Sequence, residues 1–407
     1  MKRFYFDYAA TTQIDPEVLK EINFNLRNNF GNPGSLHYFG QKAMASVDKS
    51  REKIAKSIGA DFREIIFTGS ATEANNLALR GVVKFFKISS QSALRQKNSP
   101  LKIIVSSIEH ESILETAKDL EKEGVEVVYL KVNKNGVVDL DQLKKKLNER
   151  TVLVSIMYAN NETGAIQPLF EIKKIINDFK KRNPQLPTPN SKKKSKFLIN
   201  QLANYPLFHT DAVQAFQYLD CDVNGVDLMT VSAHKIYGPK GIGALYARNN
   251  NLNPIITGGG QEFRLRSGTE NVALMAGFAK AIELANEKRQ KEKKRIFLLT
   301  QYFFKEIKKI IPSAQLNTEK AERLPNILNI VFPGYDAESL LIKLDLNGIA
   351  VSRGSACMAR SSQASYVLKE MGLSENKQRS SLRFSFGKFT TKEEMSSALK
   401  IIKKTLK

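Results

Sequence analysis

The sequence has little cysteine, little histidine and no tryptophan. Only Cys221 and Cys357 occur among 407 residues, so a disulfide framework is excluded and a reducing compartment is favoured. There are four histidines, no two at a metal-ligand spacing, and there is no Cys-x-x-Cys motif. The sequence therefore predicts no metal site.

Long hydrophobic runs are also absent. No apolar stretch approaches the roughly 18 residues that a membrane span needs. The first residues, MKRFYFDYAATT, lack the apolar segment of a secretory signal peptide. We expect no membrane association and a cytoplasmic location.

Acidic residues are too few to balance the basic ones, and the net charge is +22. The excess lies mainly in 181–197, in 288–295 and at the C-terminal end. Two interpretations fit: a solvated lysine-rich surface, or contact with an acidic protein or RNA. Because the lysines form no recognisable motif, the first is preferred and direct nucleic-acid binding is not expected.

Short β-branched runs alternate with amphipathic helical patterns over the first two thirds of the chain. This alternation predicts an α/β fold with a mostly parallel sheet that is covered on both faces. The predicted strands are EIIFTG, KIIVSSIEH, VEVVYLKV, TVLVSIMY, PLFHTDA, DLMTVSA and GALYAR. Residues 89–100 and 181–206 read as surface loops inserted between elements.

Near residue 265 the pattern changes to a long charged helix, about 271–311, followed by short strands and helices. We therefore predict a large domain over 15–265. A smaller α+β domain would combine 1–14 with 266–407.

Polar clusters follow the predicted strands: TGSAT, SSIEHES, NNETG, HTDAVQ and SAHK. In parallel sheets, active sites form at the carboxyl ends of the strands. Taken singly, these residues are ambiguous. Lys235 could be a surface lysine, Asp211 a turn residue, Thr72 a helix cap and His110 a structural histidine.

Together, the four residues suit pyridoxal 5'-phosphate. A lysine would bind the cofactor covalently, and a carboxylate would keep its ring nitrogen protonated. A helix N-terminus would hold its phosphate.

Motifs along the whole chain strengthen this interpretation. They are FDYAATT, FGNPGSLH, TGSATEANN, the EH of SIEHES, YANNETGAIQP, HTDAVQ, SAHKIYGPKGIGALY, RSGTEN, PNILN, GSAC and SLRFSFGKFTT. In this order they resemble the cysteine desulfurases, which are fold-type I pyridoxal phosphate enzymes of the class V aminotransferase family. The resemblance implies a seven-stranded, mostly parallel sheet in the large domain.

The resemblance also implies a role for each matching residue. Catalysis would use Cys357 as the nucleophile, Lys235 as the cofactor lysine and His110 as the residue that moves protons. Asn161 and Arg383 would hold the substrate carboxylate. The cofactor would be bound by Lys235, His110, Asp211, Gln214, Ala71, Thr72, Ser232 and His234, and by Thr269 of a second subunit in a homodimer.

The implied activity removes sulfur from L-cysteine and leaves L-alanine and a persulfide on Cys357. A sulfur-acceptor protein is implied as partner, either an iron–sulfur scaffold or a tRNA-thiolation enzyme. Two alternatives stay open: a selenocysteine lyase or other class V enzyme, and a basic protein- or RNA-binding module that has lost catalysis.

The cysteine-bearing stretch VSRGSACMARSSQASY, 351–366, resembles the long loops of relatives that pass sulfur to scaffold proteins. Arg353 departs from the small residue expected there, and its charge could favour the Cys357 thiolate or attract an acidic acceptor. Cys221 matches no family motif and is predicted to be structural.

Overall fold

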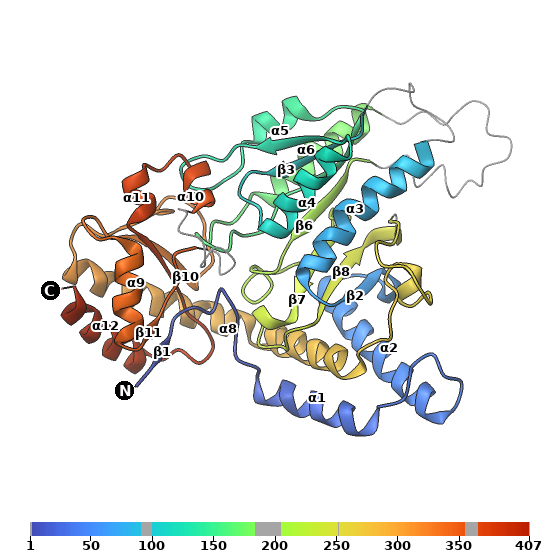
Figure 1. Cartoon of the computed structure of the whole chain (residues 1–407), viewed down its shortest axis with the longest axis horizontal. Coiled ribbons are helices and arrows are strands. Elements are labelled where there is room, and N and C mark those ends of the chain that lie inside the picture. Colours follow the sequence, from blue (N-terminus) through green and yellow to red (C-terminus); the bar gives the residue numbers. More distant parts are fainter. Residues whose placement is uncertain (1, 91–99, 184–204, 251, 355–364, 407) are drawn as a thin grey trace.

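The computed structural model describes residues 2–90, 100–183, 205–250, 252–354 and 365–406 (Figure 1). Its largest sheet has seven strands in the order β2-β8-β7-β6-β5-β3-β4. Their bounds are Ile65–Thr68 (β2), Lys102–Ser106 (β3), Glu126–Leu130 (β4), Thr151–Ser155 (β5), Leu207–Asp211 (β6), Leu228–Ser232 (β7) and Gly243–Ala247 (β8). Strand β8 is antiparallel to both neighbours and the other pairings are parallel, so six strands point the same way. The predicted mostly parallel seven-stranded sheet is confirmed.

Both faces of this sheet are covered because alternate residues of each strand pack into different cores. Ile103 and Leu153 belong to the core beneath helices α3 (Ala71–Ser90) and α4 (Glu111–Lys122). Their neighbours Ile104 and Val154 belong to the core on the other face. That core contains side chains of α1 (Pro16–Asn28), α2 (Tyr38–Ile58), α5 (Leu140–Lys146), α6 (Leu169–Arg182) and α8 (Val272–Ile310).

Two smaller sheets lie near the C-terminal end of α8, away from the seven-stranded sheet (Figure 1). One is antiparallel, in the order β12-β10-β9, with bounds Ser381–Ser385, Ile327–Val331 and Gln315–Leu316. The other pairs β1 (Phe4–Tyr5) with β11 (Ile349–Ala350), so the first residues lie beside residues from late in the chain. The same part of the chain forms four helices, α9 (Ala337–Leu346), α10 (Tyr366–Glu370), α11 (Glu375–Arg379) and α12 (Lys392–Thr405). The division into domains at residues 14 and 265 stays a prediction.

The two predicted loops begin later than expected. Helix α3 continues to Ser90 and helix α6 to Arg182, so the first two residues of 89–100 and of 181–206 are helical. Most of both segments lies outside the described residues. No helix in the described ranges is long and apolar enough to cross a membrane.

A buried ion pair fixes the edge strand β2 to helix α2. The Arg51 guanidinium donates to both carboxylate oxygens of Glu262, at 2.7 and 2.8 Å, and both residues are 5% exposed. Glu262 also accepts the amide hydrogen of Phe67 at 2.8 Å. Three separate segments therefore meet at one carboxylate.

We expect Glu262→Gln to lower the free energy of unfolding by about 3–5 kcal/mol, because it leaves the Arg51 charge buried without its counter-ion. The matched control is Glu115→Gln, which breaks the exposed pair with Lys118 and should cost at most about 1 kcal/mol. Denaturant titration of both variants measures the difference. Equal losses in the two variants would contradict the role of the buried pair.

Candidate active site

A cavity of about 240 Å³ lies at the carboxyl edge of the seven-stranded sheet. Six strands end at this edge, so polar residues that are distant in sequence meet there. The lining residues are Ala9, Ala10, Ser70, Ala71, Thr72, His110, Ser112, Met157, Ala159, Asn161, Asp211, Val213, Gln214, His234, Lys235 and Arg383. Most of the residues predicted from the sequence are therefore brought together around one space.

Lys235 ends a short 3-10 helix, Ala233–Lys235, that follows β7 directly. Its ammonium group donates to the carbonyl oxygens of Ala9 and Ala10, at 2.7 and 2.6 Å. Gln214 donates to the same Ala9 oxygen at 2.9 Å. The N-terminal segment thus forms one wall of the site, and sequence reasoning assigned these two alanines no role.

Asp211 is the last residue of β6 and is only 7% exposed. Its carboxylate accepts a hydrogen bond from the Asn75 amide group at 2.8 Å and another from the Val213 amide hydrogen at 3.0 Å. These two donors fix its orientation. A buried, oriented carboxylate is what a protonated pyridine nitrogen needs as a partner.

His110 caps the N-terminus of α4, and its Nδ1 accepts the Ser112 amide hydrogen at 3.1 Å. Burial lowers the pKa of His110, the Asp211 carboxylate opposes that shift and the Lys235 charge adds to it. The ring is therefore neutral at neutral pH. With Nδ1 held as an acceptor, Nε2 carries the ring proton.

The N-terminus of α3 supplies Ser70, Ala71 and Thr72 to the cavity wall. Amides of a first helical turn have no partner within the helix, and together with the helix dipole they favour an anion. A Cβ on Gly243 of β8 would lie only 2.9 Å from the Ser70 carbonyl carbon and 3.1 Å from the Ala71 nitrogen. Glycine at this position lets the anion-binding turn pack against the sheet.

His234 lies next to this turn in the cavity wall, with its Nδ1 3.2 Å from the Thr11 hydroxyl. Burial, with the charges of Lys235 and Lys240, lowers the pKa of His234 to about 4. Ser232 is buried at the end of β7 but is not among the lining residues. Thr269 is exposed and lies outside the cavity wall.

Arg383 also lines the cavity and is 1% exposed. Its guanidinium donates to the Asn161 carbonyl oxygen and to the Asp7 carboxylate, both at 2.8 Å. Among the described residues, neither Arg383 Nε nor Asn161 Oδ1 has a hydrogen-bond partner. Buried polar atoms without partners are costly, and a ligand carboxylate and amine would satisfy this donor and this acceptor.

Cys357 lies outside the described residues, so the structure does not place the predicted nucleophile. Arg353, just before that segment, pairs with Glu338 of α9 at 2.6 Å. Its charge is therefore shared with a carboxylate on α9.

The cavity combines a lysine, an oriented carboxylate, an anion-binding helix N-terminus and an arginine for a second anion. These groups match the parts of pyridoxal phosphate and of an amino-acid substrate, so the residues fit this cofactor.

The sheet and this site are those of a pyridoxal-phosphate transferase, and the chain belongs to the aminotransferase class-V family, which it matches over residues 4–182 and 197–397. Members of this family use pyridoxal phosphate.

Individual relatives narrow the comparison. The chain is 42% identical to the cysteine desulfurase IscS of Dictyoglomus turgidum, over 100% of this chain and 95% of the relative. A solved NifS-like protein matches with 35% identity and a TM-score of 0.85, over 99% of both chains. The structure of SspA in complex with cysteine matches with 33% identity and a TM-score of 0.75, over 95% of this chain and 99% of that one. The expected resemblance to cysteine desulfurases is confirmed.

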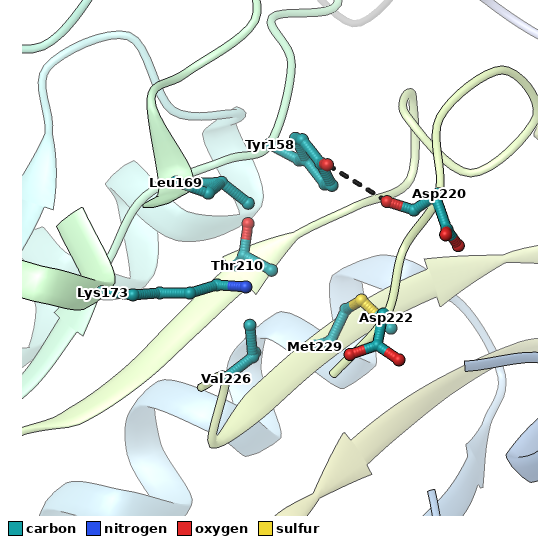
Figure 2. A pocket seen from close by; sticks show the side chains of 8 residues that line it. All are labelled: Tyr158, Leu169, Lys173, Thr210, Asp220, Asp222, Val226 and Met229. Atoms are coloured by element: carbon teal, nitrogen blue, oxygen red, sulfur yellow. Dashed lines mark hydrogen bonds between the residues drawn. The ribbon is translucent and has the colours of Figure 1, made fainter. Parts of the chain in front are cut away.

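A second cavity, of about 140 Å³, lies beside Thr210 of β6 and Met229 of β7 (Figure 2). Thr210 of β6 lines it, whereas the next residue, Asp211, lines the first cavity. Cys221 is 1% exposed and lies between the lining residues Asp220 and Asp222. Burial raises the pKa of Cys221 to about 12, so the thiol is protonated and unreactive at neutral pH. Its position in the hydrophobic core agrees with the predicted structural role.

His209 differs from the other two strand-end histidines because it lies inside the sheet. It is fully buried, between the Ser155 hydroxyl (2.8 Å from Nδ1) and the Thr230 hydroxyl (3.1 Å from Nε2). Burial lowers its pKa to about 3. The unfolded chain therefore binds more protons at this residue than the folded chain at every pH between about 3 and its unfolded pKa of about 6.5.

We expect the free energy of unfolding to fall as the pH is lowered from 7 to 4, because protonation of His209 favours the unfolded chain. His209→Gln should make this fall shallower. Denaturant titrations at pH 7, 5.5 and 4 measure the slopes. Parallel curves for wild type and His209→Gln would contradict the assignment.

Proposed function

We propose that this chain is a pyridoxal-phosphate-dependent cysteine desulfurase that converts L-cysteine to L-alanine and keeps the sulfur as a persulfide on Cys357. The observation that carries the proposal is the cavity itself. It brings Lys235, His110 and Asp211 together with Arg383 and Asn161, whose Nε and Oδ1 atoms have no hydrogen-bond partner within the described part of the chain. Full-length identity to a cysteine desulfurase supports the same activity.

The cofactor would be held at four points. Lys235 would bind it covalently, Asp211 would pair with its ring nitrogen, and Gln214 would contact its ring hydroxyl. Ala71, Thr72, Ser232 and His234 would bind its phosphate, together with Thr269 of a second subunit. When bound, pyridoxal phosphate withdraws electrons from the substrate and makes its carbon–sulfur bond cleavable.

The remaining residues act on the substrate. The Arg383 guanidinium holds the carboxylate, which a planar fork binds with two hydrogen bonds, and Asn161 assists it. His110 enters the reaction neutral and moves a proton at Nε2. The Cys357 thiolate bonds to the substrate sulfur as the carbon–sulfur bond breaks, and the carbon takes up a proton to give alanine.

We further propose that two copies of the chain associate. Large apolar side chains are exposed on α1, on the segment that joins it to α2 and at the first residue of α2, namely Phe24, Leu26, Phe30, Leu36 and Tyr38. A cluster of this kind is typical of an interaction surface. The exposed position of Thr269, outside its own cavity wall, is consistent with a role in the partner's site.

The sulfur would pass from Cys357 to an acceptor protein, for which an iron–sulfur scaffold and a tRNA-thiolation enzyme are the two candidates. We place the enzyme in the cytoplasm, where Cys357 stays reduced. Action on selenocysteine is compatible with the same residues. A binding module without catalysis is disfavoured because the lysine, the carboxylate and the arginine are all in place around the cavity.

We expect the wild-type protein to release L-alanine from L-cysteine, and Cys357→Ser to lose persulfide formation and fall to background alanine release, because serine is not a sulfur nucleophile. Alanine is measured by chromatography and persulfide by mass spectrometry. Cys221→Ser is the matched control and should stay active. Wild-type protein that releases no alanine would overturn the function, and an active Cys357→Ser would overturn only the nucleophile.

Leu36→Asp should weaken dimer formation, because it would bury an unpaired charge in the interface. The control is Leu346→Asp, which changes another exposed leucine, on α9 (72% exposed, against 90% for Leu36). Light scattering over a dilution series gives the mass. A wild-type protein that is monomeric at micromolar concentration would contradict the proposal.

A further inference from the structure

Tyr237, two residues after Lys235, holds an unusual backbone conformation. Its φ is 65°, in the left-handed region that bulky residues rarely adopt. Its amide hydrogen is donated to the Thr12 hydroxyl at 2.9 Å, and its carbonyl accepts the Asp15 amide hydrogen at 2.9 Å. These contacts compensate the strained turn that follows the cofactor lysine.

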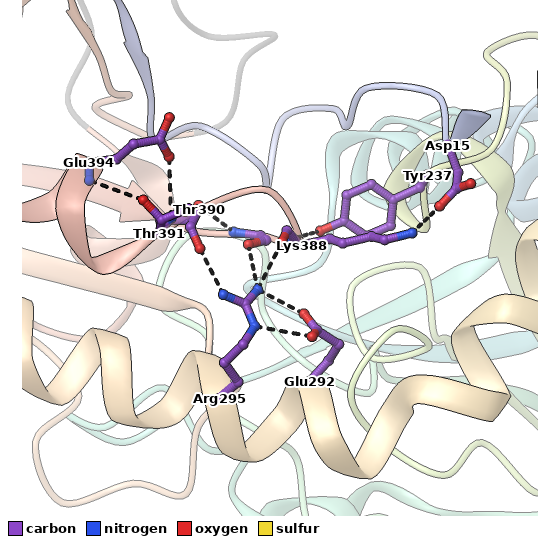
Figure 3. A network of polar contacts seen from close by, with 9 residues as sticks. Asp15, Tyr237, Glu292, Arg295, Lys388, Thr390, Thr391 and Glu394 are labelled. Carbon is purple, nitrogen blue, oxygen red and sulfur yellow. Dashed lines mark hydrogen bonds and ion pairs between the residues drawn. The ribbon is translucent and has the colours of Figure 1, made fainter. Parts of the chain in front are cut away.

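The phenol of Tyr237 contacts the loop that follows β12. Its oxygen accepts the amide hydrogen of Lys388 at 2.6 Å (Figure 3). A Cβ on the adjacent Gly387 would lie 2.5 Å from that oxygen and 2.2 Å from Cδ1 of Tyr8. Only glycine allows the loop to approach the two rings this closely.

That loop, 387–391, is itself firmly held. The Arg295 guanidinium, paired with Glu292, donates to the carbonyl oxygens of Gly387, Lys388 and Thr390 at 3.2, 2.9 and 2.7 Å (Figure 3). The Lys388 ammonium pairs with Asp15. The loop begins two residues after β12, the strand that carries Arg383.

We propose that Tyr237 is a positioning residue that sets the separation between Lys235 and Arg383. One end of Tyr237 belongs to the turn that carries the lysine, and its other end docks on the loop that follows the arginine strand. The inference rests on the proposed function, because Arg383 must bind the substrate carboxylate while Lys235 holds the cofactor. No covalent chemistry is assigned to Tyr237.

The test is Tyr237→Phe, which keeps the ring and removes the hydroxyl that accepts the Lys388 amide hydrogen and is also hydrogen-bonded to Tyr218. We expect the KM for L-cysteine and the dissociation constant for L-alanine, measured by calorimetry, to rise about threefold to tenfold, which is the range of one hydrogen bond. The kcat should stay within about twofold. Hydrogen exchange of the amides in 387–390 should accelerate by a similar factor, with or without cofactor.

A second variant removes a different hydrogen bond of the same loop. Thr390→Val removes the hydroxyl that accepts the Gly387 amide hydrogen at 3.1 Å, and it should raise KM in the same direction. The control is Tyr335→Phe, which loses a phenol hydrogen bond to the Leu406 carbonyl, far from the turn, and should leave KM unchanged.

Faster exchange or a lower Tm in Tyr237→Phe with an unchanged KM would show a purely structural role and overturn the inference. A fall in kcat at constant KM would overturn it as well. Wild-type protein that does not desulfurise L-cysteine would refute the proposed function, and with it the inference. The proposed function is tested by the activity of the wild-type protein alone, whereas the inference is tested by the ratio of the variant KM to the wild-type KM.

Discussion

The common direction of six strands is the constraint on which the rest of the structure depends. Parallel strands end at one edge, so residues as far apart as Thr72, His110, Asp211 and Lys235 must meet there once the sheet forms. Strand β8 alone runs the other way. The chain reverses its direction between β7 and β8, and Lys235 and Tyr237 lie in this connection. The lysine is therefore held in a short turn at the edge of the sheet.

The site is built from buried polar groups whose partners come from other parts of the chain. Lys235 donates hydrogen bonds to two backbone carbonyls, and Asp211 accepts one from Asn75. Arg383 donates to the Asp7 carboxylate and to the Asn161 carbonyl. An unpaired charge would be expensive at this depth, so these partners keep the side chains oriented before any ligand arrives. Arg383 Nε and Asn161 Oδ1 are cavity atoms without a hydrogen-bond partner in the described ranges, so a ligand that pairs with them gains binding energy.

Much of this could be predicted from the sequence because strand periodicity and strand-end polarity are local signals. All seven strands of the large sheet were predicted. Lys235, His110 and Asp211 were candidates because they follow predicted strands, and their combination and the family motifs gave them their roles. Contacts made through the backbone left no such signal: nothing in FDYAATT indicates that the carbonyls of Ala9 and Ala10 would face Lys235. Burial was equally hidden, since His209 follows the same strand-end pattern as His110 yet lies inside the sheet. The ends of α3 and α6 were missed because polar residues continue both helices.

The pairing of the chain's beginning with its end has a consequence for biosynthesis. Strand β1 pairs with β11, and the Ala9 amide donates a hydrogen bond to the Ser385 hydroxyl. Asp7 forms an ion pair with Arg383. A ribosome releases the N-terminal segment hundreds of residues before these partners exist. The cavity wall that contains Ala9 can therefore gain these contacts only after the last part of the chain has been made.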